Sequence, residues 1–121
     1  MFADDDPPDL SIRPTVGLVG GETVQFIEGN WWNPNVPGVV VSDGAFSLIE
    51  QVITGAQPYS SFIDRYGVTK LPASFIGPAI RRLREAAKAT GEVEEQRLFG
   101  ELADYLESAE RRGLSVTVAG Y

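Results

Sequence analysis

The chain has 121 residues, of which 43% are hydrophobic and 22% charged, with no cysteine and no histidine. These proportions are typical of one folded domain; they exclude a disulfide scaffold, a thiolate nucleophile and any imidazole-dependent site. The net charge of −7 arises in the first half, because residues 1–60 contain eight acids and one base whereas 61–121 contain nine of each.

The amino-terminal segment is acidic and contains two prolines, which predicts a flexible tail over residues 1–8 of a single domain spanning 1–121. It lacks the basic and then apolar pattern of a secretory signal, and no later stretch approaches the roughly 18 apolar residues that cross a bilayer. We therefore expect a soluble cytoplasmic protein that does not enter membranes.

Two runs rich in β-branched residues, 10–19 and 22–28, predict strands separated by Gly20-Gly21, which permits a tight hairpin turn. Pro14 cannot donate a backbone hydrogen bond, so the first strand is expected at the edge of the sheet. In the second run, the alternation places Val24 and Phe26 on one face together with Glu28.

The middle of the chain combines a loop, a short strand and a helix. Residues 30–38 are rich in asparagine and proline and contain Trp31 and Trp32, which predicts a rigid loop. A buried strand is expected over 39–42. Ser42 or Asp43 then begins a helix whose apolar positions, Phe46, Ile49 and Ile53, are spaced for one face. A second short helix is expected over 59–66.

The carboxyl-terminal half predicts two amphipathic helices, 72–90 and 92–112, followed by an alternating strand over 114–119. Opposed charges on either side of the turn between the helices are expected to form solvated ion pairs. The predicted fold class is α+β: a small, mainly antiparallel sheet packed against a helical hairpin, with the carboxyl-terminal strand returning to the sheet.

Few catalytic chemistries remain for this composition. Carboxylate pairs, a Ser-Lys dyad or a hard metal on oxygen ligands are conceivable, but the sequence has no EF-hand spacing and no phosphate-binding glycine motif. The one basic cluster, Arg81, Arg82 and Arg84, is expected to be neutralised by nearby acids, which argues against nucleic-acid binding. We expect no cofactor, no metal and no enzymatic activity.

The tryptophan loop is the best candidate for a binding site. Trp31 and Trp32 are adjacent, so in an extended backbone they point to opposite sides and one ring can serve as an exposed anchor; alternatively, both rings cover the core. The candidate partner-binding residues are these two tryptophans with nearby acids and an aromatic segment: Trp31, Trp32, Glu22, Glu28, Asp43, Glu50, Tyr59, Asp64 and Tyr66.

A small acidic α+β domain with an exposed aromatic loop and no catalytic motif resembles the immunity proteins that bacteria make against their own secreted toxins. The resemblance is to a class without a shared motif, so it assigns a role to no single residue. It implies a non-enzymatic protein that neutralises a cognate basic toxin by direct binding. The alternatives are a self-associating structural or assembly subunit of a phage or bacterium, which would form a homo-oligomer, and a carboxylate-dependent enzyme.

Overall fold

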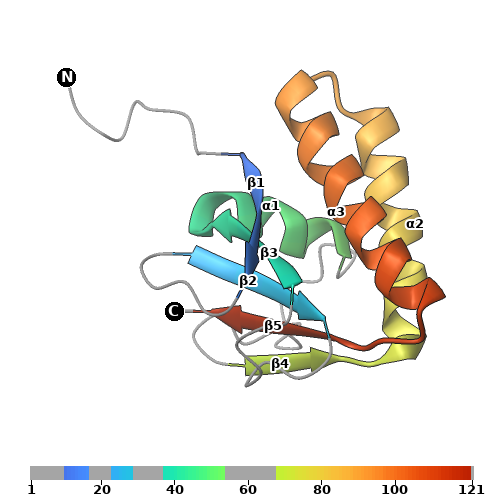
Figure 1. Cartoon of the computed structure of the whole chain (residues 1–121). Helices are drawn as coiled ribbons and strands as arrows, with labels where there is room; N and C mark the ends of the chain where they lie inside the picture. The colour runs from blue at the N-terminus through green and yellow to red at the C-terminus, as the bar shows by residue number, and fades with distance from the viewer. Residues whose placement is uncertain (1–9, 17–22, 29–36, 54–67, 121) are drawn as a thin grey trace.

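The computed structural model describes residues 10–16, 23–28, 37–53 and 68–120, and these form an α+β domain (Figure 1). Antiparallel pairing joins the described strands into one five-stranded sheet. The elements in chain order are β1 Ile12–Val16, β2 Thr23–Glu28, β3 Pro37–Ser42, α1 Asp43–Ile53, β4 Val68–Leu71, α2 Ala73–Ala89, α3 Val93–Arg111 and β5 Val116–Gly120.

The strand order is β1-β3-β2-β5-β4, which confirms β1 as an edge strand and β5 as the strand that returns to the sheet. The predicted hairpin between the first two strands is wrong, because β3 lies between β1 and β2. Both long sides of β2 are already paired, one with β3 and one with β5. A glycine pair permits a tight turn but does not choose the neighbour of a strand, and the valine-rich β3 gains more burial inside the sheet than at its edge.

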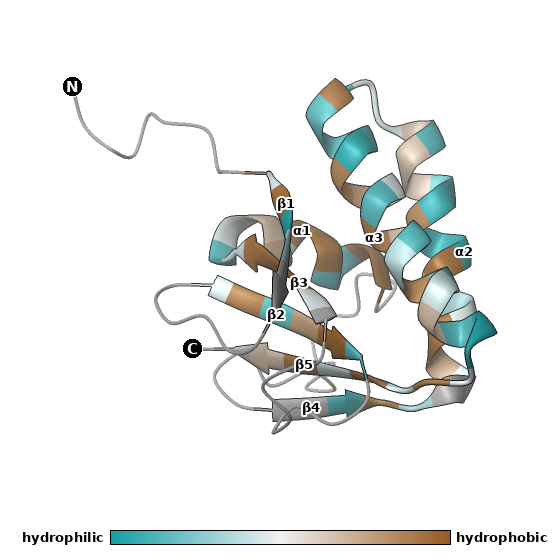
Figure 2. Cartoon of the chain, in the orientation of Figure 1, coloured by the Kyte–Doolittle hydropathy of each residue, from teal (hydrophilic) through white to brown (hydrophobic). Residues whose placement is uncertain are grey.

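All three described helices pack on one face of the sheet. Val24 and Phe26 of β2 lie in this core, and the Phe26 ring centroid is 6.1 Å from that of Phe46 in α1. Apolar residues recur every three to four positions in α2 and α3. Hydrophilic and hydrophobic bands therefore follow one another along both helices (Figure 2). The buried hydrophobic residues of the hairpin are Ile76, Ala79, Ile80, Leu83, Leu98, Phe99, Leu102, Ala103, Leu106 and Ala109.

Two glycines are required by the backbone. A Cβ at Gly38 in β3 would lie 2.4 Å from the Phe26 carbonyl oxygen, closer than any real Cβ contact. Gly113 follows α3 with a φ of 70°, a conformation that side-chain-bearing residues rarely adopt. There the amide of Gly113 donates to the Glu110 carbonyl and that of Leu114 to the Ala109 carbonyl, a Schellman cap that ends the helix and directs the chain into β5.

Candidate functional site

The helix α1 presents one apolar and one polar side, as its sequence predicts. Ser42 caps its amino terminus, because the Oγ atom of Ser42 accepts a hydrogen bond from the Ala45 amide at 3.1 Å. Asp43 in the first turn adds a negative charge that the helix dipole favours. The side that packs on the core consists of Ala45, Phe46, Ile49 and Ile53, all buried.

The opposite side of α1 carries two of the acids that the sequence assigned to the interface. Asp43 is exposed and Glu50 is partly exposed. They are seven residues apart, so two helical turns place them on one side, about 10 Å from each other along the axis. Ser47 and Gln51 lie beside them on that side, and the Ser47 hydroxyl donates to the Asp43 carbonyl at 3.3 Å. We call Asp43, Ser47, Glu50 and Gln51 the α1 acidic face.

The carboxyl terminus of α1 is fastened to the helical hairpin. Arg82 of α2 donates from Nη1 to the Ile53 carbonyl oxygen at 2.8 Å. This guanidinium satisfies one of the carbonyls that a helix end leaves without an intrahelical partner, and its charge is favourable there. The α1 acidic face is therefore held between a serine cap at one end and an arginine contact at the other.

A third candidate acid, Glu28, has a different environment. Its side chain is 7% exposed and forms an ion pair with Arg112, whose side chain is 50% exposed. Tyr105 lies in the same region and donates its hydroxyl proton to the Phe26 carbonyl oxygen at 3.1 Å. Burial raises the pKa of Tyr105 well above its ordinary value, and the nearby Glu28 charge raises this pKa further while Arg112 opposes the increase. The charge of Glu28 is thus used within the chain, where it joins the end of β2 to the end of α3.

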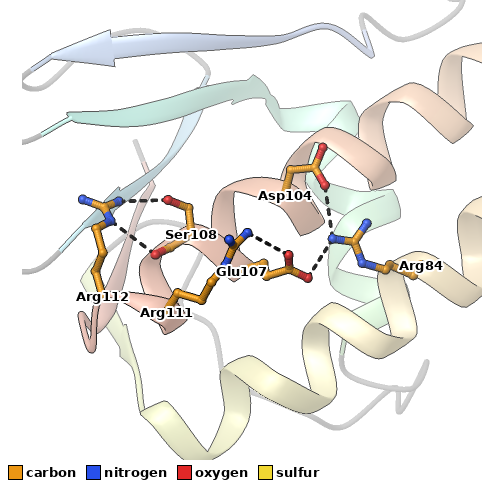
Figure 3. Close-up of polar contacts among 6 residues, drawn as sticks. All are labelled: Arg84, Asp104, Glu107, Ser108, Arg111 and Arg112. Carbon is orange, nitrogen blue, oxygen red and sulfur yellow. Dashed lines mark hydrogen bonds and ion pairs between the residues drawn. The ribbon is translucent and has the colours of Figure 1, made fainter.

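Ion pairs also connect the two helices of the hairpin (Figure 3). Arg84 of α2 reaches the carboxylates of Asp104 and Glu107 on α3 at 3.1 and 3.0 Å, and Arg111 contacts Glu107 at 3.0 Å. The hydrogen bonds from Arg84 to Glu107 and Asp104 raise the pKa of Arg84. The charges close to the turn were expected to form these pairs, with Glu92, Glu94 and Glu95 as the acids. The acids that pair with Arg84 are instead Asp104 and Glu107, which lie further along α3.

The other candidate residues lie outside the described part of the chain: Trp31, Trp32, Glu22, Tyr59, Asp64 and Tyr66. Among the residues that the structure describes, no group of three acids is placed to hold a metal ion. None of the described helices is long and apolar enough to span a bilayer.

Comparisons with known proteins give no relative. No family model matches the chain, and neither the curated proteins nor the solved structures contain a match. The interpretation of this protein therefore depends on its own residues.

Sequence reasoning missed the structural roles of Arg82 and Arg112. The sequence places Arg82 in the basic cluster of the hairpin and Arg112 at the end of the predicted helix 92–112. Nothing in the local sequence marks an arginine that reaches a distant helix end or strand. Glu28 and Arg112 are 84 positions apart in the sequence. The one signal that could have revealed this ion pair is the pairing of the strands next to these two residues. Because β5 follows Arg112 closely and pairs with β2, the register that sets Glu28 opposite Val116 brings the two charges together.

Proposed function

We propose that this protein is a non-enzymatic binding protein that meets a basic protein partner through the α1 acidic face. Its most concrete form is the neutralisation of a cognate basic toxin in the cytoplasm. The observation that carries the proposal is the position of Asp43 and Glu50 on the solvent side of one helix, whose other side is fixed in the core. A rigid helix presents its charges to a partner without a large loss of conformational entropy on binding.

The charge distribution supports the same proposal. Glu28 pairs with Arg112. Asp43 and Glu50 belong to the half of the chain that contains eight acids and one basic residue, Arg13, and this half has a negative field. Such a field accelerates the encounter with a positively charged surface and disfavours nucleic acid and anionic lipid. The acids act as recognition groups in this proposal, with no bond made or broken.

Affinity capture with matched variants tests the proposal. The bait proteins are the wild type, the double variant Asp43→Lys/Glu50→Lys, and the control Glu94→Lys/Glu101→Lys. The control reverses two exposed acids with the same seven-residue spacing on α3, one of them also in a first helical turn. Both double variants change the net charge equally.

The proposal requires that the wild type and the control capture one basic protein, which mass spectrometry identifies. The α1 variant should fail to capture this protein. That protein must then bind the purified wild type directly. Retention by all three baits, or equal loss from both variants, contradicts a specific role for the α1 acidic face. Circular dichroism of each bait verifies that it is folded.

A further inference from the structure

The solvent-facing side of α3 carries a regular stripe of residues. The stripe follows a spacing of four, three, four, three and four positions, which aligns side chains along one side of a helix as in the seam between two paired helices. We call these residues the α3 outer stripe: Val93, Arg97, Gly100, Asp104, Glu107 and Arg111. Val93 is 71% exposed, and the side chains of Asp104 and Arg111 are each 73% exposed, so solvent reaches the stripe from end to end.

Two members of the stripe are not explained by the packing of a single chain. Among the described residues, Val93 is the one large hydrophobic side chain that is mainly exposed to solvent. Gly100 lies in the interior of α3, and a Cβ built there would meet no atom within 4 Å. The fold thus leaves room for a side chain at a position where glycine costs about 1 kcal/mol relative to alanine. A glycine on a helix surface does, however, allow another helix to approach closely.

We propose that the α3 outer stripe is a contact between two copies of this chain, whose α3 helices pair antiparallel and cross between Gly100 and Asp104. When the stripe is paired with an antiparallel copy about its midpoint, Arg97 faces Glu107 of the second copy, and the two-fold symmetry repeats this pair. Parallel pairing would instead set Arg97 against Arg97. The charge order of the stripe is therefore complementary to itself in one orientation.

The contacts of Glu107 within the chain are compatible with this pairing. Its two carboxylate oxygens accept from Arg84 and Arg111, one each, and each oxygen has a second lone pair for another donor. Val93 then lies against Arg111 of the second copy, where the aliphatic part of the arginine side chain can cover the exposed valine. This contact is separate from the α1 acidic face, so it does not depend on the proposed function.

Sedimentation velocity between about 1 μM and 1 mM, covering the usual range of weak dimers, tests the proposal in low and high salt. The wild type should convert from monomer to dimer as its concentration rises, and salt should weaken the dimer because exposed charges are screened. Arg97→Glu should weaken it at least about tenfold by placing like charges opposite each other. Arg13→Glu, the same reversal on β1, should leave the dimer unchanged.

Gly100→Gln supplies the second test. Its side chain would lie where the two helices cross, while its Cβ would meet no atom within 4 Å in the monomer. It should weaken the dimer at least about tenfold, while the thermal midpoint measured at the lowest concentration does not fall. Gly91→Gln, placed in the turn where a Cβ also meets nothing within 4 Å, should not change the dimer. A wild type that remains monomeric throughout the range, or a dimer that neither Arg97→Glu nor Gly100→Gln weakens, overturns the proposal.

Discussion

Replacing Arg112 by glutamine should destabilise the protein far more than its exposure suggests. A substitution on the surface usually changes stability by less than about 0.5 kcal/mol, and the Arg112 side chain is 50% exposed. Its partner Glu28, however, is 7% exposed. Removing one member of a fully buried ion pair costs about 3–5 kcal/mol, because the other charge is left without compensation. Since Arg112 itself is half exposed, water can partly replace it, and we expect a loss of about 2 kcal/mol.

The magnitude can be assigned to the ion pair by a double-mutant cycle. Glu28→Gln leaves Arg112 with access to water and should cost about 1 kcal/mol, the usual value of one hydrogen bond. The double variant Glu28→Gln/Arg112→Gln has two neutral amides in place of the charges and should be more stable than Arg112→Gln alone. The interaction energy should therefore be at least about 1 kcal/mol.

Urea unfolding at pH 7, followed by circular dichroism, gives the free energies of unfolding for this cycle. Arg111→Gln is the matched control, because the neighbouring arginine pairs with Glu107 at the surface and should contribute less than about 1 kcal/mol. The reasoning is refuted if Arg112→Gln and Arg111→Gln cost the same, or if the two single changes of the cycle simply add.

Three further predictions concern the backbone, the attachment of α1 and the response to high pH. Gly38→Ala should lower the free energy of unfolding by at least about 2 kcal/mol, because its Cβ would collide with the Phe26 carbonyl oxygen. The control Gly91→Ala should leave it nearly unchanged. Equal free energies for the two variants in urea unfolding would contradict the close approach of β2 and β3. Arg82→Ala should lower the free energy of unfolding by about 1 kcal/mol through loss of the hydrogen bond to the Ile53 carbonyl. The control Arg81→Ala should lower it less. Identical urea midpoints for the two variants would argue against a stabilising role for the Arg82 contact. The raised pKa of Tyr105 means that its stabilising effect is complete below the ordinary tyrosine pKa near 10 and is lost as the pH rises above it. The free energy of unfolding between about pH 10 and 11 should thus fall more steeply for the wild type than for Tyr105→Phe, and parallel curves would be inconsistent with a buried phenol.

The helices were predictable because each buries one side of a regular period. The positions of Phe46, Ile49 and Ile53 predicted α1, and the same periodicity predicted the hairpin of α2 and α3. The strand β5 was predictable from its alternation. These features are local, so a short window of sequence contains the information that determines them.

The arrangement of the strands was harder to predict because it depends on partners that are distant in sequence. The glycine pair suggested that β1 and β2 are neighbours, yet β3 separates them. The strand β4, with four residues, is too short to show an alternation. The same distinction applies to the candidate site. The seven-residue spacing of Asp43 and Glu50 within a predicted helix is local information that is sufficient to place them on one side of α1, whereas the pairing of Glu28 with Arg112 depends on the sheet register.

The association rate of the captured basic protein tests the central claim most directly. Stopped-flow mixing at low salt compares the wild type with Asp43→Lys/Glu50→Lys and with Glu94→Lys/Glu101→Lys, which have equal net charge. If the α1 acidic face guides the encounter, the first variant should associate at least about tenfold more slowly while the control stays within about threefold of the wild type, and high salt should reduce the difference. Equal association rates for the two double variants would contradict the claim, because they would show that only the overall charge matters.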